Sequence, residues 1–281
     1  MDATSQDDIF LEPDQIAVRR ARNRKFLRAA SPYVVIISSF LLWELGVWLL
    51  RIESFVLPAP SQIFVAGWEW RGPILEAAWQ TFLTTFIGFL LAIVVGVIAG
   101  TAIGASPVLY DAFYPALIGF NSVPKVAVVP ILVIWFGIGS VPAIITAFLI
   151  SFFPILVNVA TGIATVEPEL RDVLRALGAK QHQILTKVGL PRSMPYFFAS
   201  LKIAISVAFI GSIVAETVAA DAGIGHFMLV ASSRFQVPLA FAALVVTGVM
   251  GILMYAIAVM IERRMTGWAM RGTDTGIIAG G

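Results

Sequence analysis

The sequence predicts an all-α, polytopic membrane protein with about six transmembrane helices. Of its 281 residues, 59% are hydrophobic and 13% are charged, whereas a soluble domain carries about 25% charged residues. Charges are missing from residues 77–110, 126–166 and 235–261, and each gap is longer than the ~20 residues that a helix needs to cross a bilayer. The apolar runs are continuous rather than alternating, which excludes a transmembrane β-barrel and leaves bundled helices.

The predicted spans follow one another along the chain, separated by polar or Gly- and Pro-containing segments. They cover residues 33–50, 80–104, 110–137, 141–165, 196–219 and 238–261. The third span is interrupted by NSVPKVAVVP, where Pro124 and Pro130 predict a broken helix. The second carries small residues four positions apart, namely Gly88, Ala92, Gly96, Gly100 and Gly104. Small residues let a neighbouring helix approach closely, so we expect a tight helix contact here, the alternative being a face that lines a solute path.

Basic residues predict the orientation of the spans. Six Lys or Arg residues lie between Arg19 and Arg28, directly before the first span, and Arg263 and Arg264 follow the last one. Because Lys and Arg favour the cytoplasmic side, both termini are expected there. The predicted divisions are a cytoplasmic N-terminal tail (1–30), which would also contact membrane lipid, a transmembrane domain (31–265) and a cytoplasmic C-terminal tail (266–281).

The segment 167–191 interrupts the apolar pattern between the fourth and fifth spans, on the predicted cytoplasmic side. Pro168 suits the first turn of a helix, and Gly178 suits its end. A second short helix containing Ile184 is expected to end at Pro191. One apolar stripe at helical spacing consists of Leu170, Val173, Leu174 and Leu177. An apolar stripe beside basic residues favours docking of a partner or an interfacial position, and the alternative is a plain connecting loop.

The sequence DVLRALGAKQHQILTKVGLP (172–191) resembles the EAA loop of ABC-importer permeases, whose pattern is E-A-A-x3-G-x9-I-x-L-P. Gly178, Leu190 and Pro191 match at the required spacing. Val188 stands in place of Ile, and Asp172 in place of Glu. The stretches at 57–64, 121–140, 152–179 and 213–228 are similar to the nitrate/sulfonate/taurine branch of these permeases, so that the resemblance covers roughly residues 31–265.

The resemblance implies the type I ABC-importer permease fold. It implies a transmembrane subunit that forms the path for a small anionic solute in the inner membrane of a prokaryote. The implied partners are cytoplasmic ABC ATPase subunits, an extracytoplasmic solute-binding protein and a second copy of the permease. No nucleic-acid partner is expected. The residues implied to couple transport to the ATPase are Asp172, Gly178, Ala179, Gln181, His182, Ile184, Val188, Leu190 and Pro191.

ATP hydrolysis is expected on a partner chain. The sequence contains no G-x4-G-K-[ST] phosphate loop, so we predict a non-catalytic subunit that binds no cofactor, with ATP and Mg²⁺ held by the partner ATPase. It also contains no cysteine, which excludes disulfides, Cys-ligated metals and thiol nucleophiles. An integral-membrane enzyme would need a metal-binding or acid–base cluster, and the sequence shows no such spacing.

Charged residues at membrane depth are functional candidates because their desolvation is costly. Glu44, Lys125 and Glu216 are three such residues, and Asn121, Lys125 and Glu216 are the candidates for the translocation path. Lys125 could meet an anionic solute, or it could instead snorkel to the membrane surface or pair with Glu216. A different class of function is an ion- or proton-coupled carrier that uses Glu44, Lys125 and Glu216. The Gly-rich segment 221–228 is expected to form a turn or re-entrant loop, or a gate near the binding protein.

Overall fold

The computed structural model describes residues 13–265, and the regular elements in this range are all helices. The long helices are α1 (Pro13–Leu49), α3 (Arg71–Gly104), α6 (Ser140–Ala164), α9 (Leu190–Ala219) and α11 (Val237–Met265). The medium and short helices are α2 (Pro60–Glu69), α4 (Pro107–Asn121), η2 (Lys125–Val128), α5 (Val129–Phe136), α7 (Pro168–Ala176), α8 (Gln181–Ile184), η3 (Leu185–Gly189) and α10 (Ile224–Ser233).

The predicted six spans agree with these helices. Five segments are long and apolar enough to cross a membrane, namely 31–49, 71–104, 140–164, 181–219 and 237–265. The sixth candidate is the pair formed by α4 and the segment 125–136, which is bent by 75° at the break. The break lies between Asn121 and Lys125, next to Pro124, as the third predicted span required.

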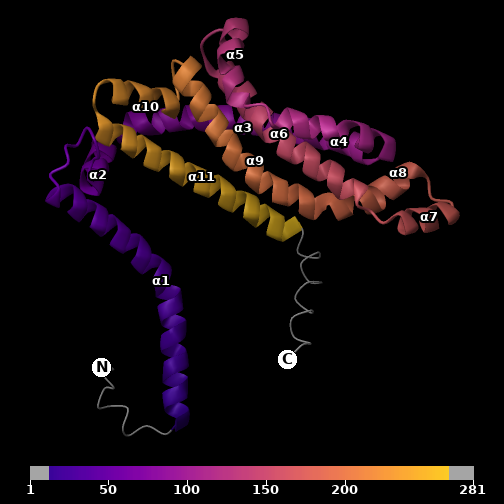
Figure 1. Cartoon of the computed structure of the whole chain (residues 1–281), viewed down its shortest axis with the longest axis horizontal. Helices are drawn as coiled ribbons and strands as arrows, with labels where there is room; N and C mark the ends of the chain where they lie inside the picture. Colours follow the sequence, from indigo (N-terminus) through magenta and orange to yellow (C-terminus); the bar gives the residue numbers. More distant parts are fainter. Residues whose placement is uncertain (1–12, 266–281) are drawn as a thin grey trace.

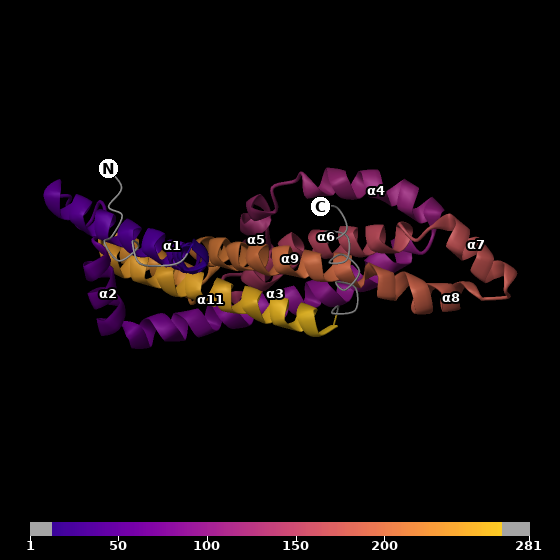
Figure 2. The same ribbon diagram turned by 90° about the horizontal axis from the view of Figure 1, so that it is seen from below.

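Helices α3, α6 and α9 form the centre of the bundle, and α11 lies along α9 (Figure 1). Two opposite ends can be recognised in both views. Helices α7 and α8 project at one end and α2 lies at the other (Figures 1 and 2), where Figure 1 also shows α10. We call these the loop end and the α10 end. The buried core follows this arrangement, with residues such as Ile155, Ala204 and Ile205 between the central helices.

The row of small residues in α3 packs against α6. A Cβ added at Gly88 would lie 2.5 Å from the carbonyl oxygen of Ile144, and one at Gly100 would lie 2.7 Å from that of Leu156. A Cβ at Gly104 would approach the carbonyl oxygen of Ala160 to 2.6 Å. The backbones therefore touch along most of the shared length, which confirms the expected helix contact and makes α3 and α6 one packed pair.

At the N-terminal end, the helical part of the chain extends beyond the predicted first span. Helix α1 already begins at Pro13, so residues 13–30 of the predicted N-terminal tail are helical and continuous with the first span. Away from its C-terminal part, α1 diverges from the bundle (Figure 1). Residues 1–12 and the predicted C-terminal tail, 266–281, lie outside the described residues.

Candidate functional site

Gly178 ends α7 as the sequence predicts. Its φ is +82°, a left-handed conformation that favours glycine. The N–H of Gly178 donates to the carbonyl oxygen of Arg175, and the N–H of Ala179 donates to that of Leu174, both at 2.9 Å. A Cβ at Gly178 would meet no atom within 4 Å, so this glycine is needed for the direction of the turn and not for space.

The far side of this turn exposes apolar and charged side chains together. Val173 is 56% exposed and Leu177 is 78% exposed. Asp172 and Arg175 form an exposed ion pair at 3.4 Å. We call the exposed side chains of Asp172, Val173, Arg175, Leu177, Lys180 and His182 the loop surface. Apolar side chains displayed among charges at the end of a membrane bundle are typical of a protein contact.

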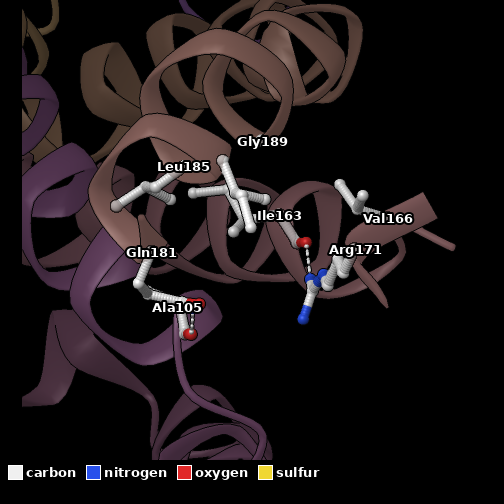
Figure 3. A pocket seen from close by; sticks show the side chains of 8 residues that line it. Ala105, Ile163, Val166, Arg171, Gln181, Leu185 and Gly189 are labelled. Atoms are coloured by element: carbon white, nitrogen blue, oxygen red, sulfur yellow. Dashed lines mark hydrogen bonds between the residues drawn. The ribbon is translucent and has the colours of Figure 1, made fainter. Parts of the chain in front are cut away.

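The near side of the turn is tied to the ends of two central helices (Figure 3). The guanidinium of Arg171 donates to the carbonyl oxygen of Ile163 at 2.6 Å, in the last turn of α6. The side-chain amide of Gln181 donates to the carbonyl oxygen of Ala105, which caps α3, at 3.4 Å. Arg175 in turn donates to Oε1 of Gln181 at 3.2 Å. We call Arg171 and Gln181, together with the neighbouring residue Ile184, the joint.

Ile184, which the resemblance implies to be a coupling residue, belongs to this joint. Its side chain is 5% exposed and lines a small hollow together with Ala105, Ile163, Arg171 and Gly189. It therefore faces the bundle and does not lie on the loop surface. The sequence placed Ile184 in a second short helix, but it could not show that the ends of α3 and α6 cover this side chain.

The second short helix does not end at Pro191, which corrects an expectation from the sequence. Residues 181–219 form one continuous helix, in which 185–189 make a π-turn. The N–H of Leu190 donates to the carbonyl oxygen of Leu185 across this turn. Since proline lacks an N–H, the wider turn accommodates Pro191 without breaking the helix, and such π-bulges are frequent at functional sites. Of the remaining predicted coupling residues, Ala179, Val188, Leu190 and Pro191 are partly buried, and Gln181 and His182 are exposed.

Glu216 lies on α9, next to the first turn of α10, and is 1% exposed. The hydroxyl of Thr81 donates to its Oε2 at 2.7 Å, and the hydroxyl of Thr84 donates to its Oε1 at 3.1 Å. The N–H of Gly225 donates to Oε2 at 3.1 Å. Thr81 itself accepts from the N–H of Ile224 at 2.7 Å. We call this cluster the latch, because it joins α3, α9 and the first turn of α10.

Two glycines make the latch possible. Gly223 has a φ of +97°, and a Cβ there would collide with the carboxylate of Glu216. A Cβ at Gly225 would collide with the carbonyl oxygen of Ile213. The expected turn at 221–228 is therefore confined to its first residues, and α10 begins at Ile224. The glycines bring the start of α10 close enough for its N–H groups to reach the carboxylate.

Lys125 does not pair with Glu216. Its ammonium group donates to the carbonyl oxygen of Asn121 at 2.9 Å and to the Oδ1 of Asn121 at 3.1 Å. It also lies 4.9 Å from the centre of the Phe153 ring, in a cation–π contact. The structure thus brings together two of the three predicted path residues, Asn121 and Lys125, and leaves Glu216 in the separate latch.

Glu44 faces a neighbouring helix. Its two carboxylate oxygens accept from the N–H of Ser61 at 3.0 Å and from the Ser61 hydroxyl at 2.7 Å. A carboxylate at a helix N-terminus satisfies N–H groups that have no partner within the helix. Glu44 therefore caps α2 and attaches α1 to it.

Lys202 also lies at membrane depth, although it was not among the charged candidates predicted from the sequence. Its ammonium group lies 2.9 Å from Oε2 and 3.0 Å from Oε1 of Glu262, which joins α9 to α11. Glu262 is 7% exposed. Lys202 could have been recognised as a lysine inside the predicted fifth span. Its partner, Glu262, follows the predicted end of the sixth span by one residue. The threonines of the latch carried no comparable signal, because Thr81 and Thr84 lie more than 130 residues from Glu216 along the chain.

Comparisons with known proteins agree with this architecture. Residues 92–267 match the family described as binding-protein-dependent transport system inner membrane component. The chain is 31% identical to the riboflavin transport system permease protein RibX of Chloroflexus aurantiacus, over 80% of this chain and 85% of that protein. It is 29% identical to the putative aliphatic sulfonates transport permease protein SsuC of Bacillus subtilis, over 90% and 92% of the two chains.

Further comparisons concern a taurine transport protein and a solved structure. Identity to the taurine transport system permease protein TauC of Escherichia coli is 28%, over 80% of this chain and 85% of that protein. A chain of the inward facing MetNI methionine ABC transporter superposes with a TM-score of 0.62 and 20% identity, covering 70% of this chain and 97% of that one. That likeness shows the fold, which is the type I ABC-importer permease fold expected from the sequence.

Proposed function

The chain belongs to the family of binding-protein-dependent transport system inner membrane components, and on that premise we propose that it forms the path for a small anionic solute and is driven by a separate ATPase. In this proposal segment 167–191 is the site at which the ATPase acts. The carrying observation is the loop surface, where Val173 and Leu177 are exposed among charges at one end of the bundle. ATP and Mg²⁺ are held by the ATPase, and this chain performs no catalysis.

The proposed surroundings follow from the same premise. The loop end faces the cytoplasm of a prokaryote, since segment 167–191 and both flanks of the transmembrane region are rich in Lys and Arg. The α10 end faces a solute-binding protein, and a second copy of the chain completes the path. The exposed apolar side chains of α1, α4 and α11 are then shared between lipid and this second copy.

The proposed solute class rests on Lys125 and Asn121 at the break between α4 and α5. Lys125 is a cation in the broken span, and a helix break at membrane depth usually lines protein or a cavity. The relatives are named for transport of riboflavin, aliphatic sulfonates and taurine. Two of these names denote sulfonates, and a sulfonate anion complements the ammonium of Lys125.

The ion- or proton-coupled carrier is not supported. Such a relay needs Glu44, Lys125 and Glu216 to exchange charge with one another. In the described part of the chain Glu44 is bonded to Ser61 and Lys125 to Asn121, while Glu216 is enclosed in the latch. None of the three is hydrogen-bonded to another.

Uptake by proteoliposomes tests the proposal. The full chain is reconstituted with an ABC ATPase and a solute-binding protein of the same organism, and radiolabelled taurine, methanesulfonate and riboflavin serve as probes. We expect uptake of a sulfonate that requires ATP and all three proteins. Replacing Lys125 with Met should raise the solute concentration for half-maximal uptake, and Lys125→Arg serves as the matched control that keeps the charge. Uptake driven by an ion gradient without the ATPase would overturn the proposal.

A further inference from the structure

The joint connects the loop to two central helices through their last carbonyl groups. The final carbonyls of a helix have no partner within it. At the end of α6 Arg171 donates at 2.6 Å to the carbonyl of Ile163, which also accepts a longer bond of 3.4 Å from the N–H of Val166, and at the end of α3 Gln181 donates to the carbonyl of Ala105. The positive charge of Arg171 is also placed at the negative end of the α6 dipole, which strengthens the contact.

The joint and the loop surface occupy different faces of the same turn. Ile184 is buried against the bundle, whereas Leu177 is largely exposed. Arg175 bridges the two faces, because it bonds both to Asp172 on the loop surface and to Gln181 in the joint. A partner can therefore bind the loop surface without displacing the contacts of the joint.

The helices held by the joint form one packed pair that extends to the latch. Close contacts at Gly88, Gly100 and Gly104 run along the α3–α6 interface. Further along α3, Thr81 and Thr84 bond to Glu216 of α9. A displacement of the loop-end termini of α3 and α6 therefore has a continuous packed route to the first turn of α10.

We propose that Arg171 and Gln181 are positioning residues that transmit displacement of the loop to α6 and α3, separately from the surface that binds the ATPase. This inference rests on the proposed function, because it requires an ATPase acting on the loop surface. In this proposal Arg171 passes the displacement to α6, and Gln181 passes it to α3. The π-turn at 185–189 lies beside both contacts, where the helix can change its direction.

Hydrogen exchange of the full complex in nanodiscs tests the proposal. The permease with its ATPase is compared in the nucleotide-free state and after trapping with Mg-ADP-vanadate, using unmodified chain, Arg171→Met and Gln181→Leu. In the unmodified complex, trapping should change the exchange of 161–167 by about tenfold, the scale of one hydrogen bond to a charged group, and that of 101–106 by about fivefold, the scale of one neutral hydrogen bond. Arg171→Met should abolish the change at 161–167, and Gln181→Leu the change at 101–106.

Two further variants separate positioning from a structural role. Arg171→Lys keeps a cation that can reach the Ile163 carbonyl and should restore the change at 161–167. Arg192→Met is the matched control, because Arg192 forms an exposed pair with Glu167 at 3.6 Å and lies outside the joint. It should behave as the unmodified chain. Both joint variants should still retain the ATPase through purification.

Three outcomes would overturn the inference. Unchanged nucleotide responses in Arg171→Met and Gln181→Leu would show that the joint transmits nothing. Loss of the ATPase from these variants would show that the joint belongs to the docking surface itself. Failure of the unmodified chain to retain any ABC ATPase would refute the proposed function, and the inference would fall with it.

Discussion

The latch and the joint are built on the same principle but differ in burial. The latch joins α3, α9 and α10, and the joint ties α7 to α6 and α8 to α3, in both cases by hydrogen bonds between polar side chains and backbone groups. The latch is closed, with Glu216 1% exposed, whereas the joint lies at the bundle surface, with Gln181 exposed and Arg171 partly buried. Buried polar contacts are strong, and breaking them leaves costly unpaired groups. The comparison shows that the latch holds α3, α9 and α10 together as one enclosed unit, whereas the contacts of the joint lie where solvent and a partner can reach them.

The largest expected effect is that of Glu216→Ala. It leaves the N–H of Gly225 without its acceptor and removes one of the two acceptors of each of the hydroxyls of Thr81 and Thr84, which keep a backbone carbonyl oxygen. Together with the cavity that the shorter side chain leaves, this should cost about 3 kcal/mol. Unfolding in mixed SDS micelles, followed by tryptophan fluorescence, measures the loss. Glu76→Ala is the matched control on α3, since Glu76 is exposed. Equal stability of the two variants would contradict the closed latch.

Alanine at Gly223 and at Gly178 compares the two regions by the same substitution. Both glycines have positive φ, which costs roughly 1 kcal/mol for another residue. Only at Gly223 would the new Cβ also collide with a neighbouring carboxylate, so Gly223→Ala should lose about 2 kcal/mol, because overpacking adds at least another ~1 kcal/mol. The same unfolding assay ranks the two. A lower stability of Gly178→Ala than of Gly223→Ala would contradict the inference that the latch is packed more tightly than the loop end.

Leu177→Ser tests the loop surface. Leu177 is 78% exposed, so the free energy of unfolding of the chain should change by less than about 0.5 kcal/mol. Its burial beneath a partner should contribute about 1.5 kcal/mol to binding, which corresponds to a roughly tenfold weaker affinity for the ATPase. Surface plasmon resonance on nanodisc-held chain measures it. An unchanged affinity of Leu177→Ser for the ATPase would show that Leu177 lies outside the interface.

The smallest effect belongs to the exposed pair of Arg192 and Glu167. The two groups lie 3.6 Å apart in water-accessible positions, and such pairs contribute about 0.5 kcal/mol or less. Arg192→Met and Glu167→Gln should leave unfolding and ATPase affinity close to those of the unmodified chain. A loss comparable to that of Glu216→Ala would mean that the loop end is as rigid as the latch.

The spans, their break and the end of α7 could be predicted from the sequence, because each follows from local chemistry. Apolar runs gave the helices, Pro124 marked the break, and Gly178 marked the end of α7. The small residues of α3 also predicted a close helix contact. These features depend on neighbours within one or two helical turns.

The contacts of the candidate sites could not be predicted in this way. Glu216 was recognised as unusual, but its threonine partners come from a helix far away in the sequence. The burial of Ile184 depends on Ala105 and Ile163, which lie on two other helices. The π-turn before Pro191 is a compromise between a missing N–H and continuous packing of α9. Tertiary contacts decide each of these features, and no local pattern records them.

The central claim is that the loop surface contacts an ABC ATPase, and site-specific photocrosslinking tests it most directly. A photoreactive amino acid is placed at Leu177 and, as a control, at Trp79, which is 60% exposed on α3, two residues before Thr81 of the latch. Crosslinked products from membranes are identified by mass spectrometry. We predict a product between position 177 and a protein that carries an ATP-binding phosphate loop, and none from position 79. A crosslink to that ATPase from position 79 but not from position 177 would contradict the account.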